Sequence, residues 1–178
     1  MQYPKSKSYE GLIKGKIMGP NPVKLTEELL MGKNIPEKSR VLDLGSGQGI
    51  TSVFLAKEYD FIVTAADLWS DPEENTKFFA SCNLTPENIT AVKADANNLP
   101  FAEESFDAVV CTDSYNYFGR NPEYLEKHLL PFVKHGGQIL ICVPGMKKDC
   151  HENLPAELLA AWTPEQLDYI HDVQYWQH

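Results

Sequence analysis

The fold of this 178-residue chain is decided by the stretch Val-Leu-Asp-Leu-Gly-Ser-Gly-Gln-Gly at residues 41–49. An apolar run that carries one acid leads into three glycines at alternate positions. Residues 50–56 then read as the start of an amphipathic helix. A strand, a tight glycine turn and a helix N-terminus in this order let the backbone approach a nucleotide-like ligand closely.

The spacing of the glycines separates two classes of nucleotide site. A dinucleotide fingerprint would have glycines matching Gly45 and Gly47 and a Gly or Ala at position 50. Position 50 is Ile50, and the third glycine stands one residue early, at Gly49. This G-x-G-x-G pattern resembles the first motif of the class I S-adenosylmethionine-dependent methyltransferases. A glycine triplet alone also fits a tight turn without a ligand, so the rest of the chain has to decide.

Length and composition favour one globular domain with a sizeable core, because 43% of the residues are hydrophobic. The formal net charge of −9 argues against a nucleic-acid partner, which would require a basic surface. The apolar runs are too short for a membrane span, and no signal-peptide pattern opens the chain. We therefore expect a cytoplasmic protein.

The cysteines predict free thiols in a reducing compartment, since none of the four stands in a C-x-x-C pair. The neighbours Cys150 and His151 suggest a metal site at first sight. Two adjacent residues without two further ligands at a recognisable spacing do not define one. The sequence therefore predicts no metal.

From residue 40 onward, strand and helix patterns alternate. Near-continuous apolar runs, which suit a parallel sheet buried on both faces, predict strands at 40–44, 61–66, 89–93, 106–111 and 138–143. Helices are expected over about 49–59, 72–82 and 121–133. The sequence therefore predicts an α/β fold, a Rossmann-like doubly wound sheet with helices on both faces and right-handed crossovers.

Three segments are expected along the chain. Residues 1–36 form an N-terminal helical segment covering the site, in which Asn21 caps a helix over about 22–33. Residues 37–145 form the core that binds S-adenosylmethionine. Residues 146–178 form a C-terminal helical segment, with short helices expected at 155–161 and 164–171.

An acid ends the second predicted strand. Asp67 follows the glycine loop by about 20 residues, the spacing at which a carboxylate accepts hydrogen bonds from both ribose hydroxyls. In a methyltransferase the next residues, Leu68 and Trp69, would contribute to a flat apolar slot for adenine. The alternatives are a turn or capping acid at 67 and core packing at 68 and 69.

The third and fourth strands carry a more specific resemblance. The sequence Asp95-Ala-Asn-Asn-Leu-Pro-Phe101, followed by Ser-Phe-Asp-Ala-Val-Val at 105–110, resembles the ubiquinone/menaquinone-biosynthesis-type methyltransferases. The resemblance implies that Asp95 accepts a hydrogen bond from the adenine amino group. It also implies that the backbone N–H of Ala96 donates to a ring nitrogen, so that acceptor and donor together read the edge of adenine.

The methionine end of S-adenosylmethionine carries a carboxylate and an ammonium group. The amides of the glycine loop, formed by Gly45, Ser46, Gly47 and Gly49, and the following helix N-terminus suit the carboxylate. Asp43 matches the family acid that faces the ammonium. An acid in a central strand is costly to bury without a partner, which supports a functional role for it.

The fourth strand ends beside the position of the methyl-bearing sulfonium in such folds. The backbone at Thr112 and Asp113 is expected to contact the methionine part. The catalytic residues are not readable, and Tyr115, Tyr117 and His151 are weak candidates for orienting or deprotonating an acceptor. Methyl transfer from a sulfonium depends mainly on positioning, so the lack of a clear base does not exclude it.

The family resemblance implies a strand order of 3-2-1-4-5. Members normally add two further strands, which the pattern after residue 143 does not predict. We expect a truncated form or a fold completed by another chain, with the fifth strand as an open edge through which a homo-oligomer could form.

The predicted function is S-adenosylmethionine-dependent transfer of a methyl group to a small-molecule acceptor. Two alternatives stay open. One is a non-catalytic or truncated domain that binds S-adenosylmethionine, and the other is an NAD-dependent oxidoreductase, which Ile50 and the pair Asp95-Ala96 disfavour. The sequence does not identify the acceptor or the methylated atom.

Overall fold

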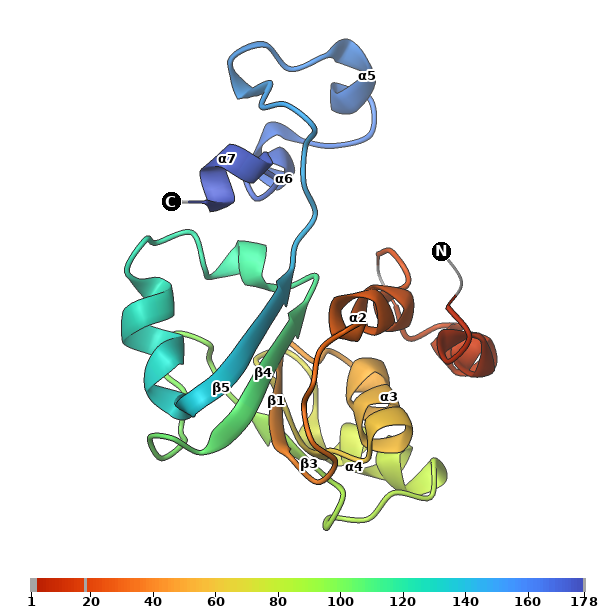
Figure 1. Ribbon diagram of the computed structural model, residues 1–178. Helices are drawn as coiled ribbons and strands as arrows, with labels where there is room; N and C mark the ends of the chain where they lie inside the picture. Colours follow the sequence, from red (N-terminus) through yellow and green to blue (C-terminus); the bar gives the residue numbers. More distant parts are fainter. Residues whose placement is uncertain (1–2, 18, 178) are drawn as a thin grey trace.

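A computed structural model describes residues 3–17 and 19–177, which form one parallel sheet with helical segments on both faces (Figure 1). The strands lie in the order β3-β2-β1-β4-β5, and every neighbouring pair is parallel. Their bounds are β1 Arg40–Leu44, β2 Ile62–Asp67, β3 Ile89–Lys93, β4 Phe106–Thr112 and β5 Val133–Cys142. The predicted doubly wound fold and its strand order are confirmed.

The helical elements are short. The α-helices are α1 Glu10–Ile13, α2 Pro22–Leu30, α3 Ile50–Tyr59, α4 Pro72–Ser81, α5 Ala156–Leu159, α6 Pro164–Leu167 and α7 Val173–Trp176. Short 3₁₀ helices occur at η1 Ser6–Tyr9, η2 Tyr115–Tyr117, η4 Leu130–Phe132 and η5 His151–Asn153, and a π-helical turn occurs at η3 Leu125–Leu129. The predicted cap of α2 is present, because the side chain of Asn21 accepts hydrogen bonds from the amides of Val23 and Lys24.

Successive residues of each strand point to opposite faces of the sheet, which divides the core in two. On one face Val41 packs in a cluster with Val53 of α3. On the other face Leu42 packs in a cluster with Tyr124 and Leu129, from the segment between β4 and β5. Both faces are therefore buried, as the continuous apolar runs predict.

The segment before β5 differs from the prediction. The prediction of a continuous helix over 121–133 is wrong. The structure has a π-helical turn at Leu125–Leu129 and a 3₁₀ turn at Leu130–Phe132 instead. Pro131 has no backbone N–H to donate to a helical ladder, which explains the break. The strand β5 consequently begins at Val133, five residues before the predicted start, and its pairing with β4 is irregular between Phe106 and Ala108.

The C-terminal segment lies beyond the carboxyl ends of the strands, where α5, α6 and α7 stand above the sheet in the view of Figure 1. A short parallel bridge joins Gly145 to His171, and the amide of Met146 donates to the carbonyl of His171 at 2.9 Å. The last strand end and the last helices are thereby connected. Within residues 3–17 and 19–177, no helix combines the length and the apolar character needed to cross a membrane.

Candidate functional site

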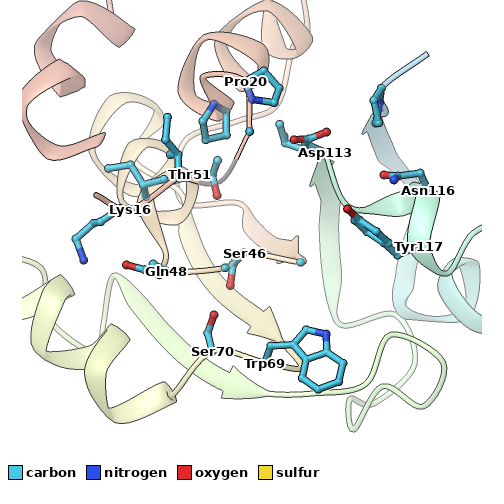
Figure 2. Close-up of a pocket in the computed structure, with 18 of the residues that line it drawn as sticks. Lys16, Pro20, Ser46, Gln48, Thr51, Trp69, Ser70, Asp113, Asn116 and Tyr117 are labelled. Carbon is cyan, nitrogen blue, oxygen red and sulfur yellow. The ribbon is translucent and has the colours of Figure 1, made fainter. Parts of the chain in front are cut away.

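A cavity of about 1090 Å³ lies at the carboxyl ends of the central strands. Its walls include the glycine loop after β1, Trp69 and Ser70 after β2, and Thr112 and Asp113 at the end of β4 (Figure 2). Parts of the N-terminal and C-terminal segments complete it. Open α/β sheets bind their ligands at this edge, so the cavity is the candidate functional site.

Backbone conformation favours glycine at all three positions of the glycine loop, and close neighbouring side chains exclude a Cβ atom at two of them. All three have left-handed backbone angles, with φ of 77° at Gly45, 53° at Gly47 and 78° at Gly49. A Cβ atom at Gly45 would lie 2.3 Å from Oγ of Ser114, and one at Gly49 would lie 2.4 Å from the ring of Phe79. A Cβ at Gly47 would meet nothing within 4 Å, so this glycine leaves room for a ligand.

Neighbouring elements hold the glycine loop in place. The amide of Gly47 donates to Oδ2 of Asp67 at 2.9 Å, and its carbonyl accepts from the side-chain amide of Asn75 at 2.9 Å. The hydroxyl of Ser114 donates to the carbonyl of Leu44 at 2.9 Å. The end of β2, the helix α4 and the segment after β4 therefore fix the loop before any ligand arrives.

The loop amides are used differently from the expectation. Those of Gly45 and Ser46 donate to the carbonyl of Ala66, and that of Gly49 donates to the carbonyl of Ser46. Together with the bond from Gly47 to Asp67, these contacts direct four amides to protein oxygens rather than to a ligand carboxylate. The side chains of Ser46 and Gln48 are the loop's polar side chains in the cavity wall.

Unsatisfied polar atoms gather at this cavity. Only three buried side-chain nitrogen or oxygen atoms in the described part of the chain have no hydrogen-bond partner, and two of them belong to Ser46 and Asn116. Both residues line the cavity. A buried polar atom without a partner is costly, so Oγ of Ser46 and Oδ1 of Asn116 indicate a polar ligand there.

Asp43 is buried directly behind the glycine loop. Its Oδ2 accepts hydrogen bonds from the hydroxyls of Thr51 at 2.6 Å and Ser52 at 2.5 Å, both in the first turn of α3. Burial raises the pKa of Asp43 to about 6, although the two hydroxyl bonds act in the opposite direction. Thr51 lies between this acid and the cavity, whose wall it lines.

Replacing Asp43 with asparagine is expected to stabilise the protein progressively, relative to the parent, as the pH rises. The folded pKa of about 6 exceeds the ordinary value of 3.8, so the folded state binds the proton more tightly. The resulting stability is complete below the ordinary pKa and is lost as the pH rises through 6. This loss amounts to about 3 kcal/mol. Urea unfolding of both proteins at low and neutral pH measures it, and a pH-independent difference would contradict the assignment.

Both oxygens of the Asp67 carboxylate are engaged by backbone amides. Besides the bond from Gly47, Oδ1 accepts from the amides of Trp69 and Ser70, each at 2.8 Å. A carboxylate offers about four lone-pair sites, and three are used here, so Oδ2 keeps room for one further donor. The predicted ribose acid is thus fixed at the tip of β2, beside the predicted ligand loop.

The predicted adenine residues lie one strand further along the sheet. Asp95 follows the end of β3, and its Oδ1 accepts from the backbone and side-chain amides of Asn97. Ala96 is buried, and its carbonyl accepts from the hydroxyl of Tyr124 at 2.7 Å. Leu68 is partly exposed and does not line the cavity, whereas the indole of Trp69 is 89% exposed and does.

The remaining candidates separate into two groups. Thr112 and Tyr117 line the cavity, and the Thr112 hydroxyl lies 3.0 Å from that of Thr26 in α2. Tyr115 is buried among aromatic side chains and does not line it. His151 lies outside the cavity, next to Asp149.

Sequence reasoning missed several side chains of the cavity wall. Asp113 was expected to contribute its backbone, but its half-buried side chain also lines the cavity, and burial raises the pKa of this carboxyl. Asn116, Trp162 and Tyr169 were not predicted at all. The last two come from the C-terminal segment, in which no motif marks them.

Comparison with known proteins gives a consistent family. Residues 41–137 match the family described as "Methyltransferase domain". The sarcosine/dimethylglycine N-methyltransferase of Aphanothece halophytica is 26% identical over 128 residues, which cover 72% of this chain and 46% of that protein. The 2-methyl-6-phytyl-1,4-hydroquinone methyltransferase of Synechocystis sp. is 34% identical over 109 residues, which cover 60% of this chain and 32% of that protein. The chain spans less than half the length of these curated relatives.

Solved structures give the same fold. Phosphoethanolamine N-methyltransferase 2 of Haemonchus contortus, solved in complex with S-adenosyl-L-methionine, superposes with a TM-score of 0.73 at 19% identity. The superposition covers 96% of this chain and 39% of that one. At this identity the likeness establishes the fold, which agrees with the strand order described above.

Proposed function

The chain belongs to the class I S-adenosylmethionine-dependent methyltransferases, and from this premise we propose that it transfers a methyl group from S-adenosylmethionine to a small-molecule acceptor. The observation that carries the proposal is the cavity at the strand ends, where Asp67 clamps the glycine loop and the buried oxygens of Ser46 and Asn116 lack partners. Bound S-adenosylmethionine supplies an electrophilic methyl group on its sulfonium.

The residues of the cavity fit this cofactor. Gly47 leaves open space for close approach, and Oδ2 of Asp67 can still accept from one ribose hydroxyl at the adjoining strand end. In this proposal residues 37–145 form the cofactor core, and residues 1–36 and 146–178 form its cover. The proposed binding residues that line the cavity are Gly45, Ser46, Gly47 and Thr112. The proposed set also includes residues next to the cavity or further along the sheet, namely Asp43, Gly49, Asp67, Leu68, Asp95 and Ala96.

The acceptor side of the cavity favours an amine. Its walls include the acids Asp113 and Glu165 together with the aromatic rings of Tyr117, Trp162 and Tyr169. Acidic and aromatic groups attract a cationic or amine-bearing ligand and disfavour an anionic one. An amine must lose its proton before it attacks the methyl group, so the site also needs a base.

Asp113 is the proposed base. It stands at the end of β4, half-buried in the cavity wall, where burial raises the pKa of its carboxyl and makes it a better proton acceptor. We expect Asp113→Asn to lower kcat by about 100-fold or more, with a smaller effect on the dissociation constant of S-adenosylmethionine. The parent's rate should rise with pH through the raised pKa, and this rise should disappear in the variant.

Glu165→Gln is the matched control for that variant, because Glu165 is also an acid of the cavity wall but is exposed. Its kcat should change by less than about threefold. Equal losses in both variants, or an unchanged pH profile in Asp113→Asn, would remove Asp113 as the base.

A methyl-transfer screen tests the function itself. The chain is incubated with S-adenosylmethionine carrying a labelled methyl group and with panels of small amines, phenols and carboxylic acids, and products are identified by mass spectrometry. Labelled product is expected among the amines. Binding of the cofactor without turnover on any panel would favour a non-catalytic binding domain instead.

A further inference from the structure

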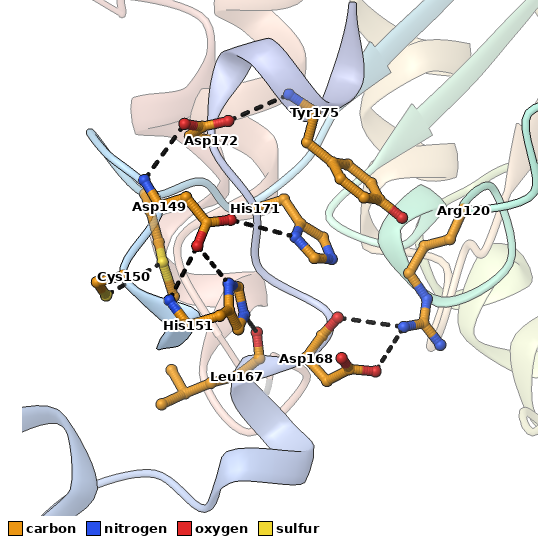
Figure 3. Close-up of polar contacts among 10 residues, drawn as sticks. Arg120, Asp149, Cys150, His151, Leu167, Asp168, His171, Asp172 and Tyr175 are labelled. Atoms are coloured by element: carbon orange, nitrogen blue, oxygen red, sulfur yellow. Dashed lines mark hydrogen bonds and ion pairs between the residues drawn. The ribbon is translucent and has the colours of Figure 1, made fainter. Parts of the chain in front are cut away.

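Three metal-ligating side chains converge outside the cavity, beside the C-terminal helices (Figure 3). Oδ1 of Asp149 lies 2.9 Å from Nδ1 of His151, and Oδ2 lies 3.8 Å from Nδ1 of His171. One ligand atom from each residue lies within 4.8 Å of the other two. Ligand atoms around one tetrahedral zinc ion stand about 3.4 Å apart, so small side-chain movements would close this group around an ion.

Both ring nitrogens of His151 face oxygen acceptors. Nε2 lies 3.0 Å from the carbonyl oxygen of Leu167, and Nδ1 lies 2.9 Å from the Asp149 carboxylate. When the neutral ring donates its Nε2–H to Leu167, the lone pair of Nδ1 points at a second acceptor. A positive charge at Nδ1, either a proton that forms an ion pair with Asp149 or a metal ion bound between the two groups, removes this repulsion. Metal-binding histidines commonly donate their other N–H to a backbone carbonyl in this way.

The other two ligands are also held in place. The ring of His171 stacks on Tyr175 with centroids 3.6 Å apart and an angle of 10°, and its side chain is only 12% exposed. The carbonyl of His171 accepts from the amide of Met146. The amide of Asp149 donates to Oδ2 of Asp172 at 3.2 Å. The group is therefore arranged by contacts that lie outside it.

We propose that Asp149, His151 and His171 bind one divalent transition-metal ion, with Zn²⁺ as the best match. Two imidazoles and one carboxylate suit Zn²⁺ and leave a fourth coordination position open, whereas Mg²⁺ prefers oxygen ligands alone. The neighbouring thiol of Cys150 is outside the set, because it contacts Sδ of Met146 at 3.6 Å.

The ion would fasten one wall of the cavity. Asp149 lies in the segment between β5 and η5, His151 begins η5, and His171 follows α6. Between them the chain carries Glu165 and Tyr169, which line the acceptor side of the cavity. Closing this loop with a metal bond would order the wall without the ion touching the methyl group, so the proposal stands independently of the proposed function.

Zinc titration of the full chain, without an affinity tag and after treatment with a chelator, tests the proposal. Calorimetry and native mass spectrometry should find one Zn²⁺ per chain. His151→Gln and His171→Gln should each weaken binding at least tenfold, whereas His135→Gln, which alters an exposed histidine of β5, should not. Absence of saturable binding by the parent would overturn the site, and so would ligand variants that bind Zn²⁺ as tightly as the parent does.

Two further measurements define the ligand set and its effect. Cys150→Ser should bind Zn²⁺ as the parent does, and loss of binding there would contradict the assigned ligands. Zinc should also slow tryptic cleavage after the exposed Lys147 and Lys148 in the parent but not in His171→Gln. Circular dichroism of each variant checks that it remains folded, and zinc-independent cleavage of the parent would count against the fastening role.

Discussion

Asp67→Asn is expected to weaken S-adenosylmethionine binding by about 100-fold. The carboxylate accepts from three backbone amides and, in the proposed complex, from one ribose hydroxyl. An amide group in its place turns one acceptor end into a donor, which then opposes either the amide of Gly47 or those of Trp69 and Ser70. Loss of the charge-assisted hydrogen bond to ribose, together with one of those to the backbone, corresponds to roughly 3 kcal/mol, and hence to the stated factor.

Calorimetric titration measures this change, and Asp71→Asn provides the matched control. Asp71 belongs to the same loop and lines the cavity, but its side chain caps α4 by accepting from the amide of Glu73. Asparagine caps helices as well as aspartate does, so the control should bind within about threefold of the parent. A folded Asp67→Asn protein with the parent's affinity would show that the ribose contact lies elsewhere.

Gly45→Ala is expected to destabilise the fold by about 2–4 kcal/mol. The added methyl group would enter the space of the Ser114 side chain, at a backbone angle that only glycine adopts without strain. The left-handed angle costs about 1–2 kcal/mol, and overpacking costs a similar amount. Gly47→Ala should lose only the first of these contributions, because its Cβ would enter open space.

Urea unfolding of the two variants separates the contributions. The double variant Gly45→Ala with Ser114→Gly should recover part of the lost stability, since the obstructing side chain is removed. Equal losses at positions 45 and 47, or no recovery in the double variant, would contradict the close approach of Ser114 to the loop.

Local patterns made much of the fold predictable. The glycine spacing at 45, 47 and 49 and the apolar runs around it depend on neighbours in the sequence, and they gave the strand order through a family resemblance. The prediction for the region before β5 was wrong because the helical pattern was continued through Pro131. The missing N–H of this proline interrupts the helical hydrogen bonds.

The site was predictable only where a motif marks it. Asp67 follows the glycine loop at a characteristic distance, and its bond to Gly47 puts it where that spacing indicates. Asn116 and Tyr169 carry no such signal, because their position in the cavity wall depends on how β4 and the C-terminal segment pack. The meeting of His171 with Asp149 is likewise a tertiary contact, and the sequence pointed only to the pair Cys150-His151.

Calorimetric titration of the full chain with S-adenosylmethionine, and separately with NADH, tests the central claim most directly. The account predicts one S-adenosylmethionine per chain with a micromolar or tighter dissociation constant, and much weaker binding of NADH. The same heat should vanish when the demethylated product, S-adenosylhomocysteine, already fills the site. No measurable S-adenosylmethionine binding, or tighter binding of the nicotinamide cofactor, would contradict it.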